Sequence, residues 1–146
     1  MKIRLFLLLF ICFAASARAQ HSSKIPLMTK VWELIADKTY KQDSKKQWVV
    51  SFPPALKALD NKVIELPGYI IPVKAGLKHS TFMFSVVPTE QCPFCGQGDI
   101  PSMIEVRAAK PLEFSEKPVR IKGKLVLNES GDGNSEIFLL NASPAS

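Results

Sequence analysis

The sequence predicts a small, mainly β domain, an antiparallel barrel or sandwich of about five to six short strands with one short N-terminal helix. After residue 60, apolar residues alternate with polar ones in several short segments. Gly, Pro, Asn and Asp stand between these segments, which is typical of turns between strands. The length of 146 residues suits one domain.

The segments before residue 60 differ from this pattern. Residues 29–36 are predicted to form a helix, because their apolar residues recur at helical spacing and Thr29 stands at the capping position. We expect this helix to cover one end of a sheet. Residues 38–47 are polar and are predicted to form a loop with Tyr40 buried, and residues 55–59 a single helical turn.

The predicted strands are residues 48–52, 62–73, 81–87, 103–108, 118–127 and 137–141. Gly68, in the middle of the second strand, predicts a bulge or a sharp bend. Trp32, Trp48 and the phenylalanines are interpreted as core residues. The strand count and the long excursion between the third and fourth strands fit an OB-like barrel, the type that binds oligonucleotides or oligosaccharides in many proteins. Such a barrel does not define a function by itself.

The N-terminus has the features of a cleavable secretory signal peptide. It has a positively charged start, an apolar run over residues 5–15, and the small residues Ala17 and Ala19 before the cleavage point. The run is too short for a resident membrane helix, and the alternative is an uncleaved anchor. We therefore expect a periplasmic or secreted protein. The predicted parts are a signal peptide (1–19), an N-terminal extension with the short helix (20–47) and an OB-like β domain (48–146).

The charge of the mature chain is only mildly positive. The full chain has 19 basic and 13 acidic side chains, a net charge of +6. Removal of Lys2, Arg4 and Arg18 with the signal peptide leaves 16 basic side chains against 13, a net charge of +3. The densest basic patch, residues 41–46, is interpreted as a solvated loop. Nucleic acid is not an expected partner, because phosphate binding needs a denser basic face.

Cys92 and Cys95 form the one chemical motif of the mature chain, since Cys12 leaves with the signal peptide. Two thiols separated by two residues can bind one metal ion. Pro93 between them and Gly96 after them suit the tight turn that such a metal knuckle needs. Thiolates prefer soft or borderline transition metals, so the motif predicts zinc or copper.

The cysteine pair supplies half of a usual zinc site, which has four ligands. We predict His79, which opens a strand next to a turn, as a third ligand. Glu90, Asp99 or Glu105 completes the set in this interpretation. Alternatively, a second copy of the chain completes it across a homodimer.

Two other chemistries fit the cysteine pair. Exported compartments are oxidising, so a Cys92–Cys95 disulfide that stiffens the loop is the first alternative, although the ring is short and its entropic stabilisation small. The second is thiol–disulfide exchange in a redox accessory protein. A thioredoxin-fold enzyme is disfavoured, because Gly96 and Gly98 oppose the helix that such enzymes place after their first cysteine. Haem attachment is rejected, because it requires a histidine at the position of Gly96.

Three motifs occur in a fixed order along the chain: Leu59-Asp60-Asn61-Lys62, then Gly68-Tyr69-Ile70-Ile71-Pro72, then Cys92-Pro93-Phe94-Cys95-Gly96. With them, residues 32–142 resemble a group of small exported bacterial proteins known mainly as a domain of unknown function. The resemblance implies an envelope protein with an OB-like barrel and no settled activity, and makes the cysteine loop a family feature. In relatives, the residues that follow the cysteine loop often read Gly-Pro-Glu-Ser. In this chain the corresponding residues 99–102 read Asp-Ile-Pro-Ser.

These patterns predict an exported, non-enzymatic binding protein of the bacterial envelope that holds zinc or copper at Cys92 and Cys95. An envelope protein or a transporter is the expected partner. No complete catalytic constellation is present, and carboxylate pairs such as Glu113 and Glu116 are ordinary surface pairs. The alternatives are an interaction module with a structural Cys92–Cys95 disulfide, and a thiol-redox accessory protein.

Overall fold

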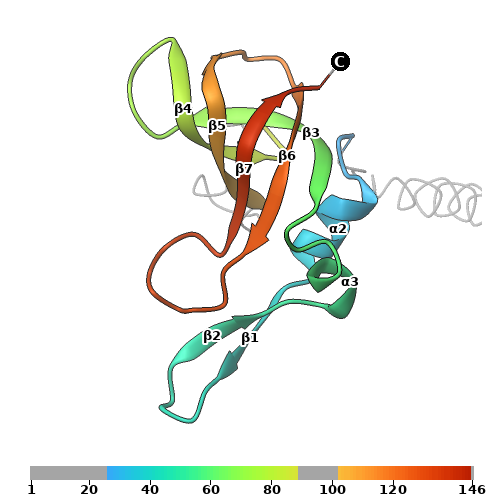
Figure 1. Ribbon diagram of the computed structural model, residues 1–146, viewed down its shortest axis with the longest axis vertical. Coiled ribbons are helices and arrows are strands. Elements are labelled where there is room, and N and C mark those ends of the chain that lie inside the picture. Colours follow the sequence, from blue (N-terminus) through green and yellow to red (C-terminus); the bar gives the residue numbers. More distant parts are fainter. Residues whose placement is uncertain (1–25, 89–101, 146) are drawn as a thin grey trace, which may run out of the picture.

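Five strands close into a barrel in the computed structural model, which describes residues 26–88 and 102–145 (Figure 1). A helix and a two-stranded hairpin precede the barrel strands and lie at one end of the barrel. The elements are α2 (Lys30–Ala36), β1 (Thr39–Gln42), β2 (Trp48–Ser51), α3 (Pro54–Lys57), β3 (Val63–Pro72), β4 (Lys78–Ser85), β5 (Met103–Glu113), β6 (Val119–Leu127) and β7 (Ile137–Pro144).

The barrel has the strand order β3-β4-β5-β7-β6, and β6 pairs back with β3. The pairs are antiparallel except that of β5 with β7, which is parallel. Counted from the first barrel strand, the order is 1-2-3-5-4, the Greek-key arrangement of an OB barrel. The predicted fold class, a mainly β OB-like barrel with few helices, is confirmed.

The alternation predicted for the strand at residues 118–127 is present in β6. Ile121, Gly123 and Leu125 are buried, and the residues between them point outward. A Cβ atom at Gly123 would lie 2.9 Å from Leu139 Cγ, closer than real Cβ contacts. Glycine therefore allows β7 to approach β6 closely at this point.

β3 changes its partner at Gly68. Residues 63–68 pair with β6 and residues 69–72 pair with β4, without a register shift within β3. A Cβ atom on Gly68 would lie 2.6 Å from Phe84 Cε1 and 2.7 Å from the Ser85 carbonyl oxygen. Gly68, for which the sequence predicts a bulge or a bend, is thus the residue at which β3 passes from pairing with β6 to pairing with β4.

The helix α2 covers one end of the barrel, as the sequence predicts. Thr29 caps it by accepting a hydrogen bond from the backbone N–H of Trp32 at 3.4 Å. Trp32 and Ile35 are fully buried, and the Trp32 ring stacks on Phe84 of β4 at a centroid distance of 6.2 Å. The apolar side of the helix therefore completes the core of the barrel.

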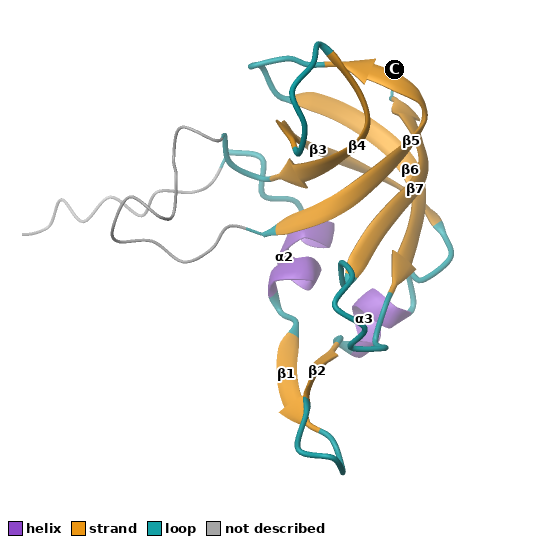
Figure 2. Cartoon of the chain, turned by 90° about the vertical axis from the view of Figure 1, so that its left-hand side faces the viewer, coloured by secondary structure: helices purple, strands orange, loops and turns teal. Residues whose placement is uncertain are grey.

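The prediction of a loop over residues 38–47 is wrong. Residues Thr39–Gln42 form the strand β1, which pairs with β2 in a hairpin that projects from the end of the barrel (Figures 1 and 2). All four residues of β1 are exposed, so burial produces no alternating pattern in its sequence. The predicted strand at residues 48–52 exists, but it pairs in this hairpin, and the barrel begins at Val63.

Three of the described aromatic residues are more exposed than expected. Phe114, which follows β5 and is interpreted from the sequence as core with the other phenylalanines, is 38% exposed. Trp48 is 67% exposed and Tyr40 is 50% exposed. Trp48 and Tyr40 belong to the hairpin, which extends beyond the core, so their rings have little to pack against. The interpretation of Trp48 as core and of Tyr40 as buried is therefore wrong, whereas that of Trp32 is confirmed.

Candidate functional site

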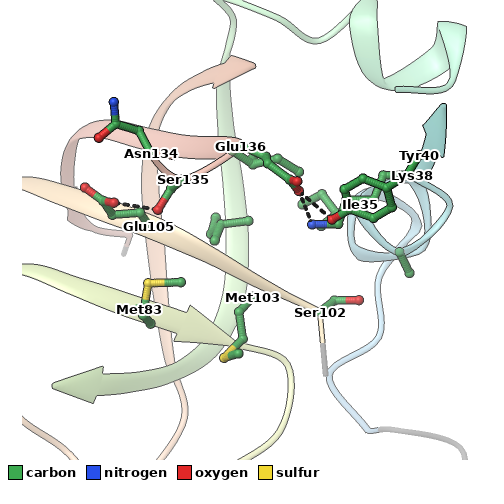
Figure 3. A pocket seen from close by; sticks show the side chains of 13 residues that line it. Ile35, Lys38, Tyr40, Met83, Ser102, Met103, Glu105, Asn134, Ser135 and Glu136 are labelled. Atoms are coloured by element: carbon green, nitrogen blue, oxygen red, sulfur yellow. Dashed lines mark hydrogen bonds and ion pairs between the residues drawn. The ribbon is translucent and has the colours of Figure 1, made fainter. Parts of the chain in front are cut away.

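A groove of about 520 Å³ lies on the outer face of β4 and β5 (Figure 3). Met83 of β4 and Met103 and Glu105 of β5 line one side of it. The residues that lead into β7 line another side, and Lys38 and Tyr40 close it toward the hairpin. OB barrels commonly bind ligands on the face of their second and third strands and at the loop between the fourth and fifth, which here are β4, β5 and the β6–β7 loop. The groove lies at that place.

A carboxylate at one end of the groove holds the hairpin to the barrel. Glu136 Oε2 accepts hydrogen bonds from Lys38 Nζ and, at 3.0 Å, from the Tyr40 hydroxyl (Figure 3). Burial alone would lower the pKa of Lys38, but the hydrogen bond and charge of Glu136, helped by Tyr40, outweigh it and raise that pKa above its ordinary value. Lys38 is therefore a cation at neutral pH, and its charge is compensated within the groove.

The second carboxylate of the groove accepts hydrogen bonds at both of its oxygens. Glu105 Oε2 accepts from the Ser135 hydroxyl at 2.6 Å, and its Oε1 accepts from Arg107 Nε at 2.9 Å. The Arg107 guanidinium lies 4.7 Å from the centroid of the Phe138 ring. Glu105 thus uses both carboxylate oxygens in contacts within the protein, whereas Glu136 uses Oε2 for both of its contacts.

Two thioether side chains stand on the floor of the groove. Met83 pairs with Glu105 and Met103 pairs with Ser85, so the two methionines are diagonal neighbours on one face of adjacent strands. Diagonal neighbours have Cα atoms about 7–8 Å apart. Both side chains are half-buried and point into the groove (Figure 3). They place soft sulfur atoms in a groove lined by both polar and aliphatic residues.

The predicted ligand His79 is described, whereas Cys92 and Cys95 lie outside the described residues. His79 is 5% exposed at the start of β4, and its Nε2 lies 3.0 Å from the Gly76 carbonyl oxygen. A carbonyl oxygen only accepts, so Nε2 carries the proton and Nδ1 is the nitrogen left for a metal.

The cysteine segment follows the opposite end of β4 from His79. His79 and Ser85 are separated along this strand by about 20 Å at the usual rise per residue. Glu105, another predicted ligand, lies in the groove, and Glu90 and Asp99 fall outside the described residues. The ligand set of Cys92, Cys95 and His79 stays a prediction.

Within residues 26–88 and 102–145, no three His, Cys, Asp or Glu side chains are grouped closely enough to hold a metal ion. No helix in these ranges is long and apolar enough to cross a membrane. The predicted signal peptide lies outside the described residues.

The sequence reasoning missed the groove and most residues that line it. One signal was available: Met83 stands between Phe82 and Phe84, and alternation places it on the outer face of its strand. The contact of Lys38 with Glu136 joins residues 98 positions apart, and no local pattern predicts such a contact.

No family model, no curated protein and no solved structure matches the chain. The resemblance to small exported bacterial proteins therefore stays a prediction.

Proposed function

We propose that this protein is an exported, non-enzymatic binding protein of the bacterial envelope. Its ligand surface is the groove on β4 and β5, and Cys92 and Cys95 hold a soft transition-metal ion, zinc or copper, beside it. The observation that carries the proposal is the position of the groove. β4 and β5 form its floor, and they are the two strands that the cysteine segment connects. Ser102, the first described residue after that segment, lines the groove.

The side chains in the groove favour binding over catalysis. Glu105 and Glu136 have their hydrogen-bonding partners within the protein. A general base needs a free carboxylate or imidazole within reach of a substrate proton. The groove instead presents hydroxyl and amide groups, as at Ser102 and Asn134, which suit the recognition of a ligand.

The thioethers of Met83 and Met103 favour copper over zinc. Thiolates and thioethers are soft ligands that select copper(I), whereas zinc sites are usually completed by imidazole or carboxylate groups. Met103 is the first residue of β5, shortly after the cysteine segment in the sequence, and Met83 is its diagonal neighbour on β4. Delivery of the ion to an envelope protein or a transporter is the role that follows.

The test begins with the mature protein purified from its export compartment without reductant. Native mass spectrometry and elemental analysis are expected to show one copper or zinc ion per chain, or one ion per dimer if two copies share it. A Cys92→Ser/Cys95→Ser variant is expected to lose the ion, and a Ser130→Ala variant, altered in the exposed β6–β7 loop, to keep it. His79→Gln tests the third ligand directly.

A metal-free protein that is two hydrogens lighter than the reduced chain would contradict the metal proposal. It would leave an interaction module with a Cys92–Cys95 disulfide, or a thiol-redox accessory protein. The reduction potential separates these two, because structural disulfides have much lower potentials than exchanging ones.

A further inference from the structure

The hairpin of β1 and β2 carries a net positive charge. Its residues 39–51 include Lys41, Lys45 and Lys46 against a single acid, Asp43. Within the described residues, none of these three lysines forms an ion pair. The hairpin also projects beyond the barrel (Figure 2). All three lysines are exposed, so a flat surface can reach them.

The turn of the hairpin holds the lysines in a defined arrangement. The Asp43 carboxylate accepts hydrogen bonds from the backbone N–H groups of Lys45 and Gln47 at 2.8 and 2.9 Å. The Asp43 N–H donates to the Gln47 carbonyl at 2.9 Å, and the Lys46 N–H donates to the Asp43 carbonyl at 3.1 Å. The one carboxylate of the turn thus bonds to backbone groups instead of the lysine side chains.

A large aromatic side chain is exposed at the end of the turn that carries Lys45 and Lys46. Trp48 follows the turn, pairs with Gln42 across the hairpin and is 67% exposed. The other tryptophan, Trp32, is fully buried. Tryptophan is enriched at the boundary between water and lipid headgroups, because its ring is apolar and its N–H is polar. Lysine extends its ammonium group from an apolar stem and suits the same boundary.

We propose that the hairpin of β1 and β2 docks the protein on an anionic lipid surface. Lys41, Lys45 and Lys46 contact the headgroups, and Trp48 inserts at the level of the headgroups. Charge complementarity selects the surface, because basic residues near an anionic bilayer each add to its attraction. The docking does not depend on the metal proposed above. The side chains that would contact the lipid do not line the groove; they are Lys41, Lys45, Lys46 and Trp48.

The experiment measures binding of the whole mature protein to vesicles. Vesicles of phosphatidylcholine with phosphatidylglycerol are compared with vesicles of phosphatidylcholine alone, by co-sedimentation and tryptophan emission. We expect binding to the anionic vesicles, a blue shift of the emission, and weaker binding as salt is raised. Brominated lipids are expected to quench the emission, and a Trp48→Phe variant to lose the shift and the quenching.

Two triple variants of equal charge separate the hairpin from the net charge of the protein. Lys41→Gln/Lys45→Gln/Lys46→Gln is expected to weaken vesicle binding by about tenfold or more. The control replaces three exposed lysines of the barrel with glutamine and is expected to bind as the wild type does. These lysines are Lys74 between β3 and β4, Lys110 in β5 and Lys117 between β5 and β6.

Three results would overturn the proposal: no binding to anionic vesicles, equal losses in both triple variants, or binding without any change at Trp48. A hairpin-dependent complex with an envelope protein, in the absence of vesicle binding, would also overturn it. Circular dichroism and urea unfolding of each variant confirm that the fold is retained, which the exposure of these side chains leads us to expect.

Discussion

The indole nitrogen of Trp32 donates a 2.8 Å hydrogen bond to the carbonyl oxygen of Pro67, and both groups are buried. The bond joins the helix α2 to the first strand of the barrel, 35 positions further along the chain. Proline has no N–H to give to a strand partner, but its carbonyl still accepts. The Trp32 side chain thus helps to position α2 on the end of the barrel in two ways: its ring packs in the core, and its N–H donates a hydrogen bond to β3.

Replacement of Trp32 by phenylalanine tests this bond. The variant keeps an aromatic ring but leaves the Pro67 carbonyl without its partner, so we expect a loss of about 1–3 kcal/mol in the free energy of unfolding. Trp32→Ala also leaves a cavity, and its loss is expected to be about 3–5 kcal/mol. Urea unfolding measures both. Trp48→Phe is the matched control, and a loss as large as that of Trp32→Phe would contradict this account.

Gly68→Ala tests the close approach of β3 to β4. The new methyl group would lie 2.6 Å from Phe84 Cε1 and 2.7 Å from a backbone oxygen, and the backbone cannot move aside without breaking strand pairs. We expect the free energy of unfolding to fall by about 1–3 kcal/mol. Val63→Ala on the same strand changes an exposed residue and is the control. An unchanged midpoint for Gly68→Ala would mean that β3 and β4 are further apart.

The pair of Lys38 and Glu136 predicts a stability difference that depends on pH. Because folding raises the pKa of Lys38, the stabilisation is fully present below the unfolded pKa, about 10.4, and is lost as the pH rises through the folded pKa. We expect Glu136→Gln to be less stable than the wild type by about 1 kcal/mol at pH 8. The difference should shrink above about pH 10.4.

Urea unfolding of both proteins across this pH range measures the difference. Glu33→Gln removes the exposed pair of Glu33 with Lys30 and is the control, for which we expect almost no effect. A difference between wild type and Glu136→Gln that grows with pH would show that the cation of Lys38 does not contribute in the folded state.

Met83→Leu/Met103→Leu tests the choice of metal. The swap preserves volume, so the expected loss of stability is below about 1.5 kcal/mol. If the thioethers add to the ligands of the cysteine pair, the affinity for copper(I) should fall by about tenfold or more, while that for zinc stays unchanged. Competition with a chromophoric chelator measures both affinities, and Met28→Leu is the control. Equal copper affinity in the double variant would confine the metal to the cysteine segment.

How far the sequence predicts the fold depends on what each strand contacts. β6 has one face on the core and one in water, so its burial follows the alternation of Ile121, Lys122 and Gly123. β1 is held by backbone pairing with β2 and buries none of its side chains, so its sequence has no such period. Trp48 shows the related limit, because hydrophobicity alone does not distinguish a core residue from one that protrudes.

The candidate site was predictable only in part. The turn beside His79 was read correctly, because Gly76 allows it, and the structure adds that the ring is buried against that turn. The groove arises where the extension before β3 meets the residues before β7. Glu136 contacts both Lys38 and Tyr40, which lie nearly 100 positions away in the sequence. Local sequence patterns do not predict contacts between residues so far apart.

The parallel pairing of β5 with β7 also determines when the barrel can form. β7 pairs with both β5 and β6, so two of the strand pairings of the barrel cannot form until β7 has left the ribosome. The pairing of β3 with β6 likewise joins strands from opposite halves of the chain. Contacts between distant segments slow folding. The barrel therefore closes only after β7, the last strand in the sequence, is available to pair with both β5 and β6.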